Sequence, residues 1–131
     1  MLGLGTLLVG CGGSGSSGGV TSGDDPVSLL EVQAQVFTPS CALTNCHTQP
    51  DPPHGLDLSS TASSATSLVG VQSFGVPAQL RVERFNSAES YLVWKITADS
   101  RIEGDPMPAF GGTLRSADVT LIETWIDQGA N

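Results

Sequence analysis

The chain has 131 residues, which is enough for one domain of ordinary size and little more. It carries five lysine and arginine residues against thirteen aspartate and glutamate residues, for a net charge of −8. Nucleic-acid binding depends on lysine and arginine to neutralise phosphates, so this composition argues against a nucleic-acid partner and against docking on an anionic membrane. A charged protein partner is expected to present a basic surface.

The segment 1–11 has the pattern of a bacterial lipoprotein signal peptide, because an apolar run ends in Leu8-Val9-Gly10-Cys11. In such peptides the cysteine receives the lipid, so lipidation is predicted at Cys11. An ordinary signal sequence with an incidental cysteine is the alternative, and no basic residue precedes the run. The run holds only about ten apolar residues, half of what a transmembrane helix needs. We therefore expect an exported protein that is lipid-anchored to a bacterial membrane, facing the periplasm or the cell surface.

Residues 12–23 are almost entirely glycine and serine, which predicts a flexible linker, and the folded domain is expected over 24–131. Asp25 and Pro26 are suited to the N-cap and the first position of a helix. Apolar residues then recur with partly helical spacing until Pro39, where the helix is expected to end. This first helix leads directly into the most informative motif of the chain.

That motif combines two thiols with an imidazole: Cys41 and Cys46 are separated by four residues, and His47 follows at once. A Cys-x-x-Cys-His sequence attaches a c-type haem, with a thioether from each cysteine and the histidine on the iron. The spacing here is longer by two residues, and both sulfurs can still reach one side of a porphyrin. The motif therefore predicts covalent haem attachment through Cys41 and Cys46 and axial ligation by His47.

A second axial ligand is predicted at Met107, the only methionine after Met1. A proline on each side stiffens the backbone there, which suits a thioether directed at a metal better than one that fills a core. A histidine and methionine pair also raises the reduction potential of a haem. His54 is a competing ligand in a proline-rich loop, although an exposed loop histidine explains it equally simply. Arg81 is a candidate partner for the haem propionates.

The remaining patterns are helical. Ser59 or Ser60 is expected to cap a helix that runs to about Leu68. A capping box at Asn86–Glu89 opens the next helix, and Ser116 caps the last, whose apolar face repeats at 3.6-residue spacing. That face contains Val119, Ile122, Trp125 and Ile126. A brief extended segment is predicted at Leu80–Val82, and no long alternating strand pattern occurs. The fold class expected is therefore all-α, a small helical bundle with long loops.

Taken together, these pieces resemble the cytochrome c-like domains of bacterial exported proteins, in the order in which that family has them. The matching stretches are 36–41, 46–47, 55–59, 90–95, 105–108 and 125–130. The resemblance implies a class I cytochrome c topology, in which the first and last helices cross beside the haem. It also implies thioether attachment at Cys41 and Cys46, proximal ligation by His47, distal ligation by Met107, and a role as an electron carrier for redox proteins.

Two alternatives without haem use the same residues. Cys41, Cys46, His47 and His54 form a possible Cys2His2 zinc set, although adjacent ligands would strain a tetrahedral site. In an oxidising compartment Cys41 and Cys46 could instead form a disulfide in a structural lipoprotein. Enzymatic catalysis is not expected, because Met107 would close the iron position that peroxidase chemistry needs.

Overall fold

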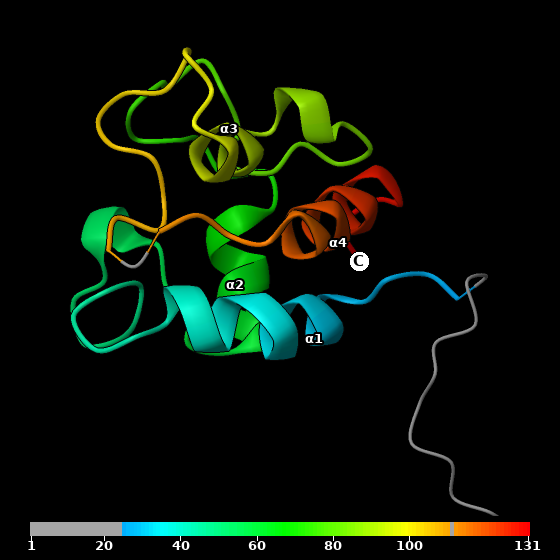
Figure 1. Cartoon of the computed structure of the whole chain (residues 1–131), viewed down its shortest axis with the longest axis horizontal. Helices are drawn as coiled ribbons and strands as arrows, with labels where there is room; N and C mark the ends of the chain where they lie inside the picture. Colours follow the sequence, from blue (N-terminus) through cyan, green and yellow to red (C-terminus); the bar gives the residue numbers. More distant parts are fainter. Residues whose placement is uncertain (1–24, 111) are drawn as a thin grey trace, which may run out of the picture.

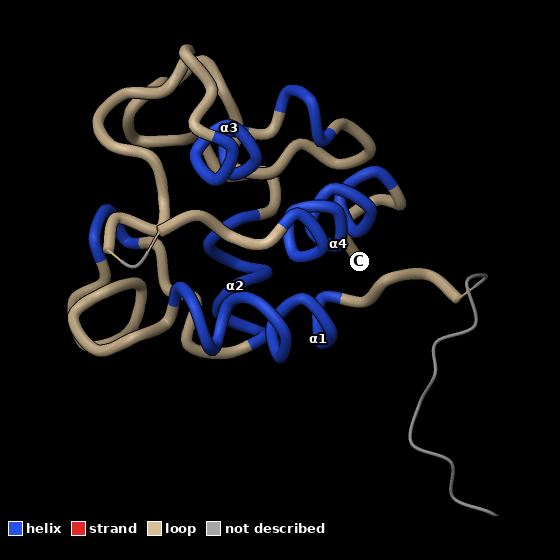
Figure 2. Tube along the Cα trace, in the orientation of Figure 1, coloured by secondary structure: helices blue, strands red, loops and turns tan. Residues whose placement is uncertain are grey.

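The computed structural model describes residues 25–110 and 112–131. These residues form helices and loops and contain no β-strand, which confirms the predicted all-α fold (Figure 1, Figure 2). No helix in this part of the chain is long and apolar enough to cross a membrane. The predictions of a signal peptide over 1–11, of lipidation at Cys11 and of a linker over 12–23 concern residues outside it.

The first helix begins as α1 (Leu29–Val32) and continues as a π-helix, η1 (Gln33–Cys41). Its N-cap is Ser28, whose hydroxyl accepts a hydrogen bond from the Glu31 N–H at 3.2 Å. The predicted start at Asp25-Pro26 is therefore wrong. The serine is favoured because its side chain lies three residues before a free backbone N–H and satisfies it.

The predicted end of this helix at Pro39 is also wrong, because Pro39 lies inside η1. In an α-helix a proline ring clashes with the carbonyl four residues earlier. Here the hydrogen bonds span five residues, as the Ala42 N–H donating to the Phe37 carbonyl at 2.8 Å illustrates. This wider turn accommodates the proline and carries the helix on to Cys41. Short π-helical segments occur often at functional sites.

The second helix, α2 (Thr61–Leu68), confirms its prediction. Ser60 is the N-cap, and its hydroxyl accepts a hydrogen bond from the Ser63 N–H at 3.1 Å. After α2 the chain forms two isolated β-bridges, Val69 with Val82 and Gln72 with Leu80. They place the backbone around Leu80–Val82 in the extended conformation that the sequence predicts.

The capping box at Asn86–Glu89 starts a short 3₁₀ turn and not the longer helix that the sequence predicts. The Asn86 side chain accepts a hydrogen bond from the Glu89 N–H at 3.3 Å, but this closes only the single 3₁₀ turn η3 (Ser87–Glu89). The chain is then extended at Ser90, and α3 (Tyr91–Thr97) begins separately. The buried Ser90 hydroxyl donates instead to the Asn86 carbonyl at 2.8 Å, which ties the two short helices together.

The last helix, α4 (Ser116–Asp127), has Arg115 as its N-cap, so the prediction of Ser116 as the cap is wrong by one residue. Asp118 would have favoured the predicted start, but its carboxylate is occupied by Arg115, with the two side chains 2.8 Å apart. The predicted apolar face is confirmed: Ile122, Trp125 and Ile126 are buried and Val119 is half-buried.

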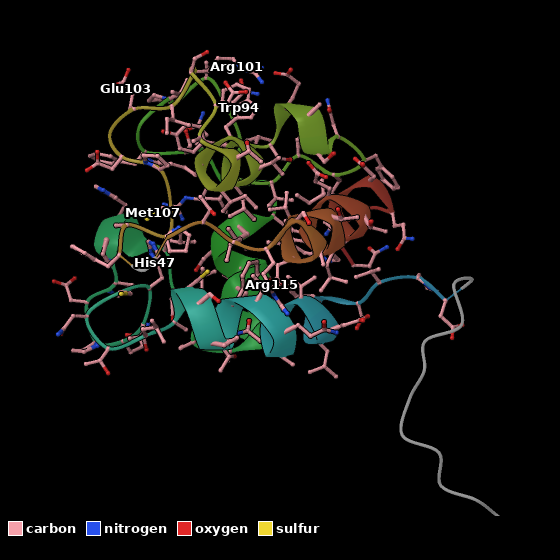
Figure 3. All side chains as sticks on the ribbon, viewed as in Figure 1. His47, Trp94, Arg101, Glu103, Met107 and Arg115 are labelled. Carbon is pink, nitrogen blue, oxygen red and sulfur yellow. The ribbon has the colours of Figure 1, made fainter. Side chains whose placement is uncertain are left out.

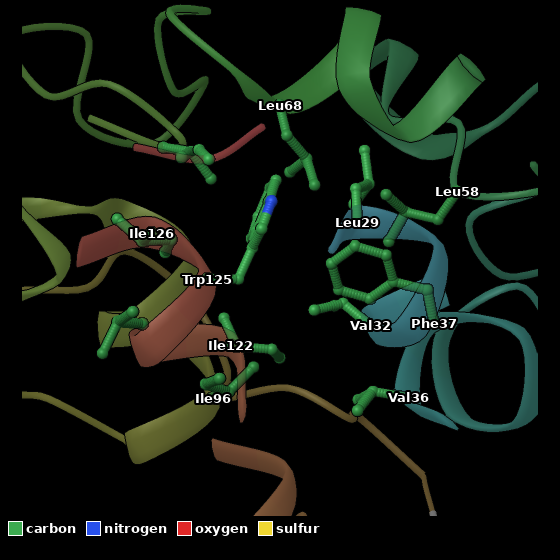
Figure 4. Close-up of a cluster of buried hydrophobic side chains, with 13 residues drawn as sticks. Leu29, Val32, Val36, Phe37, Leu58, Leu68, Ile96, Ile122, Trp125 and Ile126 are labelled. Carbon is green, nitrogen blue, oxygen red and sulfur yellow. The ribbon is translucent and has the colours of Figure 1, made fainter. Parts of the chain in front are cut away.

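The core lies between α1, α2 and α4, with α3 closing it from the other side of α4 (Figure 1). Figure 4 shows its main side chains, with the Trp125 ring directed from α4 toward the residues of the first two helices. They are Leu29, Val32, Val36, Phe37, Leu58, Leu68, Ile96, Ile122, Trp125 and Ile126. The apolar area removed from water by this cluster is the main source of stability for the domain.

Hydrogen bonds join the two ends of the described chain. The Leu29 N–H donates to the Asn131 carbonyl at 3.2 Å, and the Val27 N–H donates to the Gln128 side chain at 2.7 Å. The Trp125 indole N–H also donates to the Asn131 carbonyl, at 2.9 Å. The segments at the start of the first helix and after the last helix are therefore fastened to each other.

Candidate functional site

A cavity of about 480 Å³ lies among the loops and brings together segments that are far apart in the sequence. Its volume falls within the range of about 300–1,000 Å³ that is typical of small-molecule sites. The wall is mainly apolar, with a few polar groups. Its residues are Cys41, His47, Pro53, His54, Leu56, Leu58, Leu68, Ser73, Phe74, Gly75, Arg81, Tyr91, Leu92, Lys95, Ile96, Glu103, Gly104 and Met107. Three of the predicted haem-binding side chains, those of Cys41, His47 and Met107, thus meet at one cavity, and Figure 3 shows two of them.

The imidazole of His47 is oriented by the backbone. Its Nδ1 lies 3.2 Å from the Leu56 carbonyl oxygen, which can only accept, so Nδ1 carries the proton and Nε2 keeps a lone pair. Burial lowers the pKa of His47, although the bond to Leu56 opposes this shift. A neutral imidazole whose second nitrogen is bound to a carbonyl is the usual state of a histidine that ligates a metal.

The four residues between the cysteines form a loop that turns outward. The Cys46 N–H donates to the Leu43 carbonyl at 2.9 Å, and Asn45 adopts a positive φ of 64° at the tip. The His47 N–H then donates back to the Cys41 carbonyl at 3.0 Å. This bond closes the loop, so the longer cysteine spacing still places Cys41 and His47 beside each other.

Both thiols are free and partly exposed. Cys41 lines the cavity, whereas Cys46 is not among its lining residues. Burial raises the pKa of the Cys41 thiol to about 11, and the neighbouring Cys46 adds to the shift. The Cys41 thiol at the cavity wall is therefore held in its protonated form, and the structure does not join Cys41 and Cys46 in the disulfide of the structural alternative.

A buried polar network supports the segment 56–58 that orients His47. Gln33, in the π-helix, donates through its side-chain amide to the Leu58 carbonyl at 2.8 Å and accepts from the Ser64 hydroxyl at 2.6 Å. The Leu58 N–H in turn donates to the His47 carbonyl at 2.8 Å. Because buried polar groups are costly when unpaired, these bonds hold the segment in one position.

Asp57 lies in the same segment, and its carboxylate accepts from the Ser59 N–H at 2.9 Å and from the Gln49 amide at 2.6 Å. These hydrogen bonds lower the pKa of Asp57 to about 2, compared with about 4 in an unfolded chain. The carboxylate therefore stabilises the fold fully above about pH 4, and this contribution is lost as the pH falls toward 2.

We expect the free energy of unfolding to decrease between pH 4 and pH 2, and to decrease less in an Asp57→Asn variant. Urea denaturation followed by circular dichroism at each pH measures this difference. Subtracting the variant from the native chain removes the contribution of the other acidic groups. If the free energy of unfolding falls equally with pH in the two proteins, the hydrogen bonds to the Asp57 carboxylate do not lower its pKa in the folded state.

Met107 reaches the cavity from a loop that α3 holds in place. Its backbone N–H donates to the Lys95 carbonyl at 2.9 Å, and its side chain is half-buried. The Lys95 ammonium donates to the Glu103 and Asp105 carbonyls, both at 2.7 Å. The loop containing the thioether is thus attached to the helix at several points.

Two of the five cationic side chains, those of Arg81 and Lys95, line the cavity. Arg81 donates to the Ser67 carbonyl at 2.8 Å and to the His54 carbonyl at 2.7 Å. Over the described ranges, neither cation forms an ion pair with a carboxylate. The cavity wall therefore carries two cationic residues and one acidic residue, Glu103, in an otherwise acidic protein, which favours a ligand with negative groups.

His54, the competing ligand, also lies at the cavity wall, at the end nearest Phe74. Its ring is stacked on the Phe74 ring, with centroids 4.1 Å apart and an angle of 20° between the planes. Both side chains are exposed. The stack accounts for the position of the ring, and the Arg81 bond to the His54 carbonyl holds the backbone there.

The zinc alternative requires the side chains of Cys41, Cys46, His47 and His54 to converge. Three of these residues, Cys41, His47 and His54, line the cavity, and Cys46 is not among its lining residues.

Lys95 and Tyr91 are the cavity residues to which the sequence patterns assign too small a role. Both fall in the matching stretch 90–95, and the sequence patterns give neither of them a part in the chemistry of the site. Both lie on α3 four residues apart, so their side chains share one face of the helix. One feature of the sequence points to Lys95. It is the only lysine in an acidic chain, and a single lysine of this kind can mark a specific contact.

Comparisons of the chain with protein-family models, with curated proteins and with solved structures give no match.

Proposed function

We propose that the chain is a monohaem c-type cytochrome that carries electrons between redox proteins. The observation that supports this most directly is the cavity of about 480 Å³ at which an imidazole, a thioether and a thiol meet, from His47, Met107 and Cys41. When bound, the haem supplies an iron that accepts one electron to become ferrous and gives up one to become ferric. The protein residues hold that group and set its potential.

In this proposal Cys41 and Cys46 attach the macrocycle by thioethers, and His47 ligates the iron through Nε2. The Leu56 carbonyl fixes the tautomer and the orientation of His47 by accepting from Nδ1. Met107 would hold the iron through its thioether. Together with the imidazole of His47 it would favour the reduced state and would leave no iron position for a substrate, so the proposed role is electron transfer without catalysis.

The rest of the cavity fits the other parts of a haem. Its leucine and isoleucine side chains suit the apolar face of the ring, and a dry, apolar surrounding helps to set the potential. The haem also carries two propionate carboxylates. Arg81 retains guanidinium donors beyond the two that it uses on backbone carbonyls, and we propose that these donors bind a propionate.

The finer fold assignment, a class I cytochrome c-like bundle, belongs to the same proposal. In support, α1 and α4 are in contact, and the Leu29 N–H reaches the Asn131 carbonyl. The net charge of −8 supports redox partners with a basic docking surface. Export and a lipid anchor at Cys11 complete the proposal and rest on the sequence pattern alone.

The test is to express the full chain with export in a bacterial host that matures c-type cytochromes, and then to measure the intact mass and the pyridine haemochrome spectrum. We expect the mass of the polypeptide with one covalently added haem and the spectrum of a thioether-linked haem. A Cys41→Ala/Cys46→Ala variant is the matched control and should lose both signals. A colourless protein whose mass includes no macrocycle would contradict the proposal.

The same measurement separates the alternatives. A disulfide between Cys41 and Cys46 would lower the mass by two hydrogens and leave the protein colourless. A zinc module would be colourless too, and zinc would be found by elemental analysis. Either result would replace the cytochrome proposal.

A further inference from the structure

Every second residue of the loop that leads to Met107 is hydrogen-bonded to α3. The Glu103 N–H donates to the Tyr91 hydroxyl at 3.1 Å. The carbonyls of Glu103 and Asp105 both accept from the Lys95 ammonium at 2.7 Å, and the Met107 N–H donates to the Lys95 carbonyl at 2.9 Å. Figure 3 shows Glu103 and Met107 along this loop, beside α3.

The end of α3 makes the Lys95 carbonyl available. The last four carbonyls of a helix have no partner within it. Ala98 adopts a left-handed conformation with φ 56°, and the Asp99 N–H turns back to the Trp94 carbonyl at 3.0 Å. The Lys95 carbonyl therefore does not accept the Asp99 N–H, and it accepts a hydrogen bond from the Met107 N–H instead. A single residue, Lys95, thus binds the loop through both its backbone and its side chain.

The hydrogen bonds from the Lys95 side chain contribute much of the contact between α3 and the loop. Hydrogen bonds from a charged donor are about twice as strong as neutral ones, and Lys95 makes two at 2.7 Å. Tyr91 adds a packed contact: a methyl group at Gly75 would lie 2.6 Å from the tyrosine hydroxyl and 3.0 Å from Glu103 Cβ. The loop is therefore packed between α3 and the segment around Gly75.

We propose that Lys95 is a positioning residue that holds the 103–107 loop against α3, so that the Met107 thioether stays directed at the iron. This inference rests on the proposed function, because it assigns a purpose to the loop only when a haem occupies the cavity. It goes beyond that function by naming a residue that does not touch the iron and yet determines whether the distal ligand remains bound.

The test compares Lys95→Leu with the native chain, both as purified haem proteins. The substitution keeps the backbone carbonyl and an apolar side chain at this position, removes the ammonium, and adds no iron-binding group to the cavity that Lys95 lines. We expect hydrogen exchange of peptides covering 103–107 to become about tenfold faster, since two hydrogen bonds that close the loop are lost. The absorption band of the thioether bound to ferric iron should weaken, and imidazole added in solution should bind the iron more tightly.

Two variants serve as controls. Lys95→Arg keeps a cation with several donors and should restore most of the native exchange rate and band intensity. Arg101→Leu removes one positive charge next to α3, where Arg101 lies 3.8 Å from the Trp94 ring and pairs with Asp99 and Glu89. Arg101 does not bind the loop carbonyls, so this variant removes a nearby charge and its own contacts while leaving the Lys95 bonds in place, and its exchange at 103–107 should be native.

The outcomes are distinct. If the native protein carries haem and Lys95→Leu leaves both the exchange and the thioether band unchanged, the inference is overturned while the proposed function stands. Faster exchange with an unchanged band would also overturn it, because the loop would then be held without effect on Met107. Absence of haem from the native protein would overturn the proposed function itself, and with it any role of Lys95 toward the iron. Faster exchange together with a weaker band, confined to Lys95→Leu and reversed in Lys95→Arg, is the result expected.

Discussion

In the proposed cytochrome, replacing Met107 with alanine is expected to leave the haem covalently attached and to lower its reduction potential by a fraction of the roughly 0.8 V that axial ligands control. The thioether stabilises ferrous iron relative to ferric iron, so its removal favours the oxidised state. The distal position then opens to water or an added ligand. Potentiometric titration measures the shift, and the loss of the thioether band together with the binding of added imidazole reports the open site.

Leu92→Ala is the matched control for this prediction. Leu92 lines the same cavity but has no lone pair to donate to a metal. Its truncation should change the packing while leaving the thioether band in place. If Met107→Ala and Leu92→Ala have the same spectrum and potential as the native protein, Met107 is not a ligand, and His54, at the same cavity, becomes the residue to test.

Replacing Trp125 with alanine is expected to lower the free energy of unfolding by about 3–5 kcal/mol. The ring is fully buried at the centre of the core, and its indole N–H donates to the Asn131 carbonyl at 2.9 Å. The substitution leaves a large cavity and removes one of the two hydrogen bonds to the Asn131 carbonyl, which keeps the bond from the Leu29 N–H. The stability of a small domain is about 5–15 kcal/mol, so this loss is a large fraction of the total.

Urea denaturation of the same protein preparation gives this free-energy difference directly. Phe110→Ala is the control: it also truncates an aromatic ring, but that ring is 90% exposed, so the change should stay within about 0.5 kcal/mol. A Trp125→Ala protein as stable as the Phe110→Ala protein would show that the core is not organised around α4.

The first and last residues of the helices are only partly predicted by local sequence patterns in this protein. Ser60 caps α2 as predicted, because a serine before a helix satisfies a free N–H wherever the fold places it. The predicted limits at Asp25-Pro26, Pro39 and Ser116 are wrong. A cap contributes only about 1 kcal/mol, so a shift of a few residues is decided by contacts elsewhere. The Val27 bond to Gln128, which holds the chain before α1, is one such contact.

The candidate site is also predicted only in part by the sequence. Cys41, Cys46, His47 and Met107 can be recognised from the sequence, because the chemistry of a thioether link or of a metal ligand belongs to the side chain itself. The loop that closes the longer cysteine spacing cannot be recognised, since it depends on the His47 N–H reaching back to the Cys41 carbonyl.

By itself, the sequence determined which side chains are available for the proposed chemistry and that the domain would be helical, since both follow from residue type and short-range periodicity. Only the tertiary structure decided that His47 and Met107 line one cavity, that Leu56 orients the imidazole, and that Lys95 holds the methionine loop. The physical reason is that these contacts join residues beyond a single helical turn, eight to ten positions apart for the Leu56 and Lys95 bonds and farther for His47 and Met107. Their formation depends on the path of the loops in the folded chain, which no local pattern specifies.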